Sequence, residues 1–378
     1  MKSILDKRIG IVGGGQLGKM MILEAKRLGF YAVVLDPAAD CPASCICDEV
    51  IVGSLYEPEG YFKLAKKVDV ITYEWENICA DSLSKLEEAG HYIYPSVSAL
   101  KCIQNKYIQK KMLREAGILV PKLEKISNID DMYAFGFPLM LKTASGGYDG
   151  KGVASAKSAV DAESAFAQLG GGKVDLFAEE LINFEKEISV IACRGIDGVR
   201  VIYPVAENIH VNGILDTTIV PARIGADVEN KAKKTAEKVM DVFAGVGTCC
   251  IELFVTDKGD VYVNEVAPRP HNSGHYTIEA CFANQFENHI RAVTGLPLGN
   301  VELITPAVMV NLLGEDSGKA VVYGLKEAYL DPQVRVHVYG KSESKKGRKM
   351  GHFTVVDETV EGAAERAEKL KSVVKINI

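Results

Sequence analysis

Hydrophobic residues in the first hundred positions alternate between short β-branched runs and stretches with helical spacing. Strands are predicted by the runs Arg8–Val12, Tyr31–Leu35, Glu49–Val52 and Val68–Thr72. Helices are predicted between them, near Gly60–Lys67 and over Leu17–Leu28, where Gly29 suits the C-cap. This alternation is typical of a parallel, doubly wound sheet, so we predict an α/β domain over residues 1–100.

The pattern becomes less regular after residue 100. Residues 101–120 have helical spacing that ends at Gly117 and Pro121, which predicts one helix leading into a new unit. From Phe137 onward, strand-like runs are joined by glycine-rich and charged turns, with helices predicted after Ser158 and over Asp227–Phe243. Strands and helices do not alternate strictly here, so we predict a mixed α+β domain over residues 101–305.

A third unit is predicted after Pro306. Short strands and then a closing amphipathic helix are indicated over Ala307–Leu312, Val334–Tyr339, His352–Val356 and Glu358–Val373. We therefore predict a small β-rich domain over residues 306–378.

Composition and charge narrow the class of protein. The 378 residues are 47% hydrophobic and 25% charged, as expected for a globular chain with more than one core. The formal net charge of −6 gives no basic field for a nucleic-acid backbone or an anionic membrane, so we expect neither partner. No run of eighteen apolar residues occurs, and we expect a cytoplasmic protein whose nine cysteines are free thiols.

Two glycine-rich segments are candidates for phosphate binding. Gly13, Gly15 and Gly18 follow a predicted strand and open a helix, and Asp36 ends the next strand, as in a dinucleotide fingerprint. A phosphate on another small molecule satisfies the same turn, so NAD is one alternative among several. The second segment, Lys142–Val153, combines glycines with two lysines and could fold over a polyphosphate, although a plain hairpin turn is the alternative.

An acidic pair is predicted on two facing strands. If residues Lys258 and Gly259 form a two-residue turn, Glu252 stands directly opposite Glu265. Two carboxylates about 4 Å apart repel by about 4 kcal/mol at an effective dielectric near 20, so a cation is needed to offset them. Mg²⁺ suits such oxygen ligands, and Asn264 adds another. The alternative is a pair that points to solvent, where the repulsion is weak.

Polar residues with anion-binding groups flank this hairpin and recur elsewhere. Arg269, His271, Asn272 and Ser273 follow the acidic strand in a loop stiffened by prolines, which indicates a site for a small anion. Glu74, Glu76 and Asn77 follow the strand ending at Thr72, at the edge of an open sheet where ligands bind. A basic run near the C-terminus, which includes Lys341, Arg348 and Lys349, could supply cations to a substrate phosphate or form a solvated face.

Taken together, these segments resemble those of N5-carboxyaminoimidazole ribonucleotide synthetases, ATP-grasp enzymes of purine biosynthesis. The resemblance covers the whole length and rests on GGGQLG, TYEWEN, GGYDGKG, NEVAPRPHNSGHYT and YGK…GRKMGH in that order. It implies an ATP-grasp fold with an N-terminal Rossmann-like (pre-ATP-grasp) domain, a lid at about 122–182 and a small C-terminal β-rich domain. It also implies a homodimer.

The implied reaction is a ligation that consumes ATP and bicarbonate. Carboxyphosphate forms first, and its carboxyl passes as CO₂ to the exocyclic amine of 5-aminoimidazole ribonucleotide, with ADP and phosphate released. The implied cofactors are ATP and Mg²⁺, and the unstable product suggests a transient hand-off to the next mutase of the pathway.

The resemblance implies a role for each matched residue toward ATP. Lys106 and Lys142 would contact the phosphates, under a lid formed by Gly147, Tyr148, Asp149, Gly150, Lys151, Gly152 and Val153. The adenine would be read by Glu179, Glu180, Leu181 and Ile182, with Glu187 on the ribose and His210 lining the pocket. Glu252 and Glu265 would hold Mg²⁺, assisted by Asn264.

The second site is implied in the same way. Arg269, His271 and Lys341 would act on bicarbonate and carboxyphosphate as catalytic groups, with Asn272 and Ser273 beside them. The aminoimidazole ribonucleotide would contact Gln16, Leu17, Glu74, Asn77, Tyr148 and Asp149, with its 5'-phosphate on Lys341 and Arg348.

Three other functions compete with this interpretation. The first is another ATP-grasp ligase, such as a formate-using transformylase or a biotin carboxylase-like module, but the HNSGHYT segment after NEVAPRP favours the enzyme that uses bicarbonate and aminoimidazole ribonucleotide. An NAD-dependent oxidoreductase rests only on GGGQLG and Asp36. A silent nucleotide-binding protein has no positive support, because every expected charged group is present.

Overall fold

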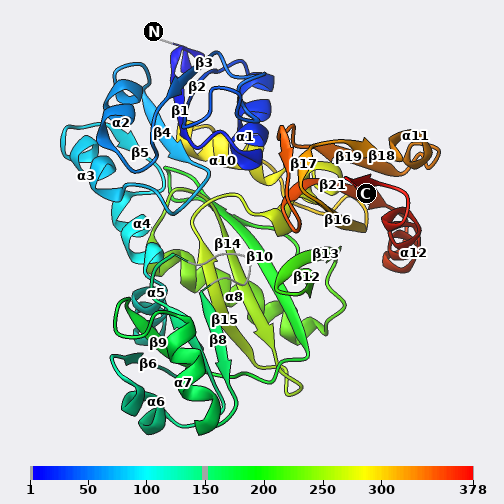
Figure 1. Ribbon diagram of the computed structural model, residues 1–378. Coiled ribbons are helices and arrows are strands. Elements are labelled where there is room, and N and C mark those ends of the chain that lie inside the picture. Colours follow the sequence, from blue (N-terminus) through cyan, green and yellow to red (C-terminus); the bar gives the residue numbers. More distant parts are fainter. Residues whose placement is uncertain (1–2, 147–151, 378) are drawn as a thin grey trace.

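The computed structural model describes residues 3–146 and 152–377. Its N-terminal part is the predicted parallel sheet, with strand order β3-β2-β1-β4-β5 (Figure 1). The elements are η1 (Ile4–Asp6), β1 (Arg8–Val12), α1 (Gln16–Arg27), β2 (Tyr31–Asp36), β3 (Glu49–Val52), α2 (Pro58–Ala65), β4 (Val70–Tyr73), α3 (Ala80–Glu88) and β5 (Tyr92–Ile93). The predicted α/β pattern is therefore confirmed over this part of the chain.

One helix that covers this sheet comes from far along the sequence. Helix α10 (Gln285–Thr294) packs beside α1, and Phe286, Ile290 and Val293 are buried in one core with Ile9 and Met21. Figure 1 shows α10 lying among the N-terminal elements. The opposite face is covered by α2 and α3, so both faces of the parallel sheet are closed, as such sheets require.

The prediction of a single helix over residues 101–120 is wrong. Two helices replace it, α4 (Val97–Gln104) and α5 (Lys106–Glu115), because Asn105 adopts extended backbone angles (φ −105°, ψ 103°). Its side chain accepts a hydrogen bond from the N–H of Ile108, which is the N-cap role that Asn prefers to a helix interior. The break places Lys106 at the first position of α5.

A separate four-stranded sheet follows, with order β6-β9-β7-β8. Two helices pack on it, and the six elements are β6 (Leu123–Ile126), α6 (Ile129–Phe135), β7 (Leu139–Thr143), β8 (Val153–Ala156), α7 (Ala159–Gln168) and β9 (Leu176–Glu180). This sheet lies within the segment assigned to the lid.

The largest sheet has nine strands and runs through the remainder of the molecule. Its order is β15-β14-β10-β12-β13-β16-β21-β19, and β11 pairs with β10. The strands are β10 (Lys186–Arg194), β11 (Arg200–Ile202), β12 (Ala206–Val211), β13 (Ile214–Val220), β14 (Gly247–Val255), β15 (Val261–Ala267), β16 (Ala307–Leu313), β19 (Val334–Val338) and β21 (Lys349–Val356). The C-terminal strands thus extend the central sheet, although the boundaries at residues 100 and 305 stay predictions.

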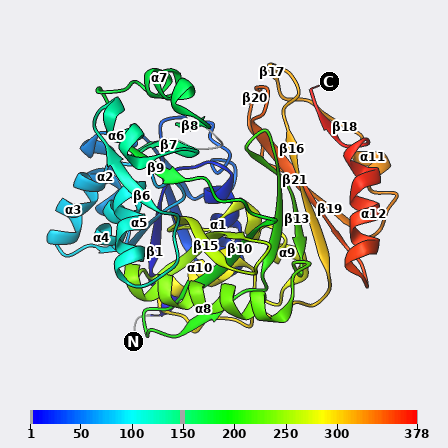
Figure 2. The ribbon, with the colours of Figure 1, turned by 90° about the horizontal axis from the view of Figure 1, so that it is seen from below.

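Helices cover the two ends of this sheet. Helix α8 (Ala226–Phe243) packs under β10 and β14, whereas α12 (Val360–Lys371) packs on β16 and β21 at the far side (Figure 2). The short elements η2 (Asn272–Gly274), α9 (Thr277–Ala280), β17 (Gly318–Lys319), β18 (Val322–Tyr323), α11 (Leu325–Ala328), β20 (Glu343–Ser344) and β22 (Lys375–Ile376) complete the fold. Within the described ranges, no helix is long and apolar enough to cross a membrane, and the nine cysteines are free.

Candidate active site

The hairpin of β14 and β15 carries the acidic pair, and its turn differs from the prediction. The N–H of Gly259 donates to the carbonyl of Thr256, and Val255 faces Val261, so the loop is longer than the two residues predicted. Gly259 has a positive φ of 72°, which is typical of a turn that closes with a left-handed residue. The predicted Lys258-Gly259 turn is therefore wrong.

The predicted pair nevertheless forms, because a β-bulge restores the register. Leu253 pairs with Val263, but Glu252 pairs with Glu265, which leaves Asn264 as an extra residue on β15. A bulge re-aims the side chains around it, and here Glu252, Asn264 and Glu265 all line one cavity. The Nζ of Lys106 lies 3.0 Å from Oε2 of Glu265. Burial and the neighbouring Glu265 raise the pKa of Glu252 to about 7.

The cavity has a volume of about 480 Å³ and is open on one side to solvent. It is bounded by the N-terminal unit, the lid sheet and the central sheet. Most of the predicted site residues that the structure describes lie in its wall, namely Gln16, Leu17, Glu74, Lys106, Lys142, Val153, Glu187, His210, Glu252, Asn264, Glu265, Arg269, His271 and Asn272. Its size suits ligands as large as a nucleotide.

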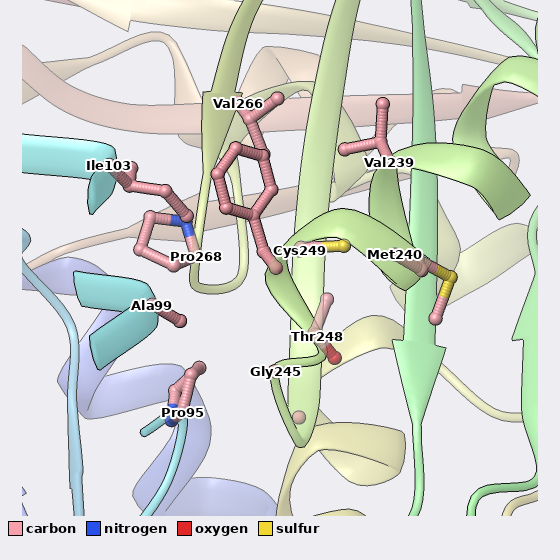
Figure 3. A pocket seen from close by; sticks show the side chains of 12 residues that line it. Pro95, Ala99, Ile103, Val239, Met240, Gly245, Thr248, Cys249, Val266 and Pro268 are labelled. Atoms are coloured by element: carbon pink, nitrogen blue, oxygen red, sulfur yellow. The ribbon is translucent and has the colours of Figure 1, made fainter. Parts of the chain in front are cut away.

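A second cavity lies between α4, α8 and β14 and does not compete for this role. Its walls are apolar, with Ile103, Val239, Met240, Cys249 and Val266 turned toward it (Figure 3). Its volume is only about 20 Å³. That is room for roughly one water molecule, so no substrate fits there.

The first glycine turn holds a carboxylate of the protein itself. Both carboxylate oxygens of Glu74 accept hydrogen bonds, from the backbone N–H groups of Gly15 and Gly18, the latter at 2.6 Å. Asp36 accepts the N–H of Gly14 at 2.7 Å. Burial raises the pKa of Glu74. Because these amides at the start of α1 are the groups that would bind a dinucleotide phosphate, the turn gives the NAD alternative no anion site.

Arg269 is fixed by an acid that the site prediction omitted. Its Nη2 donates to Oε1 of Glu76 at 2.9 Å, and its Nε donates to the other carboxylate oxygen, so the ion pair is two-pronged. Although burial opposes the charge, Glu76 raises the pKa of Arg269. The signal was visible in the sequence, since Glu76 follows a strand at the ligand-binding edge of the sheet.

Two histidines lie beside acids of the cavity wall, His210 on β12 and His271 at the N-cap of η2. His210 Nδ1 lies 3.0 Å from Oε2 of Glu187. Burial alone would lower the pKa of His210, but Glu187 raises it above its ordinary value. Nε2 of His271 lies 3.4 Å from Oε1 of Glu252. Burial and the charge of Arg269 lower the pKa of His271 well below its ordinary value. His271 is therefore a neutral ring at neutral pH.

Glu179 joins two lysines under the lid sheet. Its carboxylate lies 2.7 Å from Nζ of Lys142 and also pairs with Lys110, and Glu179 is only 2% exposed. Burial and the charge of Lys142 lower the pKa of Lys110 to about 8, whereas the two lysines hold the pKa of Glu179 below its ordinary value despite burial. No sequence signal marked Lys110, which sits on the buried side of an ordinary amphipathic helix.

Several predicted residues lie outside the cavity wall. These are Asn77, Gly152, Glu179, Glu180, Leu181, Ile182, Ser273, Lys341 and Arg348. Nζ of Lys341 donates to the carbonyl of Lys349 at 2.6 Å, and Nη1 of Arg348 donates to the carbonyl of Glu343 at 2.7 Å. Lys349 is the member of that basic run in the wall. Gly147, Tyr148, Asp149, Gly150 and Lys151 fall outside the described residues.

Comparison with known proteins agrees with this arrangement. Three family models match in order: a ribonucleotide synthetase preATP-grasp domain over residues 6–104, an ATP-grasp domain over 111–286, and a phosphoribosylaminoimidazole carboxylase C-terminal domain over 307–366. The N5-carboxyaminoimidazole ribonucleotide synthase of Bacillus subtilis is 43% identical over 351 residues, which span 92% of this chain and 90% of that protein. The chain belongs to the N5-carboxyaminoimidazole ribonucleotide synthase family.

Solved structures of this synthase family share the whole fold. The synthetase from Thermotoga maritima superposes with a TM-score of 0.90 at 45% identity, covering 98% of this chain and 99% of that one. The synthase from Aspergillus clavatus, solved with ADP and 5-aminoimidazole ribonucleotide, has a TM-score of 0.90 at 32% identity, with 98% and 99% covered. The predicted family and ATP-grasp fold are thus confirmed, and the chain is an ATP-grasp ligase of this synthase family.

Proposed function

We propose that the chain carboxylates 5-aminoimidazole ribonucleotide with bicarbonate at the expense of ATP, giving N5-carboxyaminoimidazole ribonucleotide, ADP and phosphate. One observation carries the proposal. The facing pair Glu252 and Glu265 shares a cavity of about 480 Å³ with Arg269 and His271, so an acidic wall stands beside a cationic one. A metal–nucleotide complex suits the first wall, and a small anion suits the second.

The acidic wall fits Mg²⁺ with a nucleotide. Glu252 and Glu265 offer two hard oxygen ligands with Asn264 beside them, and the raised pKa of Glu252 reflects a pair short of positive charge. Among the described residues, no group of three or more His, Cys, Asp or Glu side chains forms a closed metal site. Mg²⁺ shared with nucleotide phosphates needs only one or two carboxylates. When bound, the cation would neutralise charge on the transferring phosphoryl group.

Lysines and acids around that wall have the groups to bind the rest of ATP. Lys142 and Lys106 line the cavity and would meet the phosphates, with Lys142 oriented by Glu179. Glu187 and His210, paired at 3.0 Å, would lie near the ribose. The end of β9 at Glu180, with Leu181 and Ile182 just after it, would supply the adenine hinge.

The cationic wall suits bicarbonate and carboxyphosphate. A bicarbonate oxygen attacks the γ-phosphorus and ADP leaves; the resulting carboxyphosphate releases phosphate, and the substrate amine takes the carboxyl and loses a proton. Arg269, His271 and Asn272 line the cavity and would stabilise the negative charge that develops. Lys341 and Ser273 would act from behind the wall, since neither lines it.

The ribonucleotide would enter along the N-terminal unit. Gln16 and Leu17 open helix α1 in the cavity wall, and Glu74 lies beside them with its carboxylate on backbone amides. Lys349 is the lysine of the basic run that lines the cavity, so it joins Arg348 as a candidate for the 5'-phosphate. Asn77 would act at the edge of the site.

Assembly and location belong to the same proposal. A homodimer, a cytoplasmic location and a transient hand-off of the unstable product to the next mutase accompany this activity. Sedimentation of the purified protein would test the first of these.

One assay tests the activity. The protein with Mg-ATP and ¹³C-bicarbonate is followed for ADP release with and without 5-aminoimidazole ribonucleotide, and for ¹³C in the product. The ribonucleotide should accelerate ADP release and take up one labelled carboxyl. If it accelerated nothing, while glycinamide ribonucleotide with formate did, the assignment to this substrate would be wrong.

A further inference from the structure

Behind His271, a chain of buried polar side chains crosses three neighbouring strands. Oγ1 of Thr218 on β13 lies 3.0 Å from Oδ1 of Asn208 on β12, and Nδ2 of Asn208 lies 2.9 Å from Oγ of Ser189 on β10. Ser189 lies 2.9 Å from Oγ of Ser273 in η2, which lies 2.9 Å from Nδ1 of His271. Thr218 and Ser189 are fully buried, Ser273 is 1% exposed and Asn208 is 7% exposed.

The direction of these hydrogen bonds is fixed by one donor that cannot rotate. The backbone N–H of Ser273 points at Nδ1 of His271 at 3.3 Å, so Nδ1 is an acceptor and carries no proton. The ring is then neutral, with its proton on Nε2. Hydroxyl groups can reverse their role freely, but a backbone amide can only donate.

The role of each remaining group, as donor or acceptor, follows from the unprotonated Nδ1 of His271. Since Nδ1 accepts, the hydroxyl of Ser273 donates to it and must accept from Ser189. The hydroxyl of Ser189 therefore donates to Ser273 and accepts from the amide N–H of Asn208. The amide oxygen of Asn208 accepts from the hydroxyl of Thr218. In this orientation each of the three hydroxyl groups of the chain meets an acceptor. The opposite orientation of Asn208 would reverse the whole chain and place a proton on Nδ1, against the N–H of Ser273.

We propose that Thr218, Asn208, Ser189 and Ser273 form a positioning relay that holds His271 neutral with its proton on Nε2, aimed into the cavity at Glu252. Thr218 sets the orientation of the Asn208 amide, and the relay transmits that choice to the imidazole. His271 therefore presents a hydrogen-bond donor, not a base, to the cavity. Its catalytic consequence rests on the proposed function, because the donor would stabilise negative charge on bicarbonate or carboxyphosphate.

The relay is tested first without any substrate. ¹⁵N-histidine protein is examined by long-range ¹H–¹⁵N correlation, with the His271 signals identified by their loss in His271→Gln. Wild-type His271 should show a pyrrole-type Nε2 and a pyridine-type Nδ1. Ser189→Ala and Thr218→Val should each add a population of His271 that is protonated on Nδ1. Ser189→Ala removes the donor to the hydroxyl of Ser273, and Thr218→Val allows the side-chain amide of Asn208 to flip.

Matched variants separate the relay from general damage. Thr218→Ser keeps the hydroxyl and should restore the wild-type spectrum, whereas Thr218→Val has the same shape without the hydroxyl. Ser82→Ala removes a buried hydroxyl remote from the site, where Ser82 contacts Cys79, and should leave the spectrum unchanged. A wild-type ring protonated on Nδ1, or an unchanged tautomer in both Ser189→Ala and Thr218→Val, would overturn the relay.

Kinetics then test its consequence. Ser189→Ala and Thr218→Val should lower kcat by at least about tenfold, as loss of orienting partners commonly does, with KM for ATP unchanged and activity recovered in Thr218→Ser. A kcat that stays at the wild-type value while the tautomer shifts would overturn the positioning role. A wild-type protein with the Nε2–H tautomer and no carboxylation would instead refute the proposed function and leave the relay intact.

Discussion

Arg269 and Glu76 are 193 positions apart in the sequence, yet they form a two-pronged ion pair. Glu76 follows strand β4 of the N-terminal sheet, and Arg269 follows strand β15 of the central sheet, so the pair joins two sheets at the cavity wall. Both side chains are largely removed from solvent, at 9% and 17% exposure. The orientation of Arg269 is therefore set by the N-terminal unit.

Glu76→Gln should weaken both stability and catalysis. The substitution leaves the Arg269 charge without its partner in a site of low solvent access, which costs about 3 kcal/mol. Chemical denaturation monitored by fluorescence measures the loss, and steady-state assays should show a lower kcat/KM for bicarbonate. Glu59→Gln is the control, because Glu59 pairs with Lys63 on an exposed helix surface. Equal stability of the two variants would contradict the role given to this pair.

Glu265→Gln should lower turnover by at least about tenfold, since a charged ligand for the cation is lost. The side chain keeps its size, so unfolding should shift little. Asp257→Asn, at the exposed tip of the same hairpin, is the control and should retain wild-type turnover. A wild-type rate in Glu265→Gln would remove Glu265 from the metal site.

Affinity for Mg²⁺ should depend on pH near neutrality. Glu252 has a pKa of about 7, so the carboxyl is protonated below that pH and the cation must displace the proton. Calorimetric titration of the protein and ADP with Mg²⁺ should show affinity falling by up to about tenfold per unit between pH 7 and pH 5.5. In Glu265→Gln the like charge is gone, and the midpoint should move to lower pH. An affinity independent of pH in this range would refute the prediction.

The same carboxyl affects stability without ligand. Because its folded pKa lies above the ordinary value, the folded state binds this proton more tightly than the unfolded state. Its contribution to stability is therefore present below about pH 4.5 and is lost as the pH rises through 7. Denaturation curves for wild type and Glu252→Gln should converge at low pH and separate at pH 8, with the variant more stable.

Lys110→Met should raise KM for ATP by about fivefold, because Glu179 would pull Lys142 closer and away from the phosphates. Lys110 is 2% exposed and has no access to the cavity itself, so the effect passes through Glu179. Lys111→Met is the control, since the adjacent Lys111 is exposed and lies 3.9 Å from Glu115. If both variants kept the wild-type KM, Lys142 would not depend on this triad.

The sequence predicted the acidic pair for a reason that was only partly right. A two-residue turn at Lys258-Gly259 gives the correct partner for Glu252, but the real loop shifts the strands by one position and the bulge at Asn264 shifts them back. The longer loop leaves no mark in hydrophobic alternation. The bulge breaks the alternation of β15, where buried Val261 and Val263 are followed by Val266, but this break alone does not give the pairing of Glu265. The pair was predictable; the geometry that places Asn264 beside it was not.

Long-range partners escaped prediction for a different reason. Helix and strand patterns report which face of an element is buried, and most elements were predicted within a few residues. The ion pair of Glu76 with Arg269, the lysines on Glu179 and the place of Lys349 in the wall depend on contacts between elements distant in sequence. Local periodicity carries no information on those contacts, whereas the family resemblance supplied wall residues that no local pattern marked, such as Glu187 and His210.

Helix α10 is synthesised long after the N-terminal sheet that it covers. Residues 285–294 complete the core on one face of the N-terminal sheet, so that face stays partly uncovered until this helix has left the ribosome. A nascent chain of the first hundred residues would expose Ile9, Met21 and their neighbours, surfaces that attract chaperones. The N-terminal sheet is thus synthesised early, but its hydrophobic core is completed late.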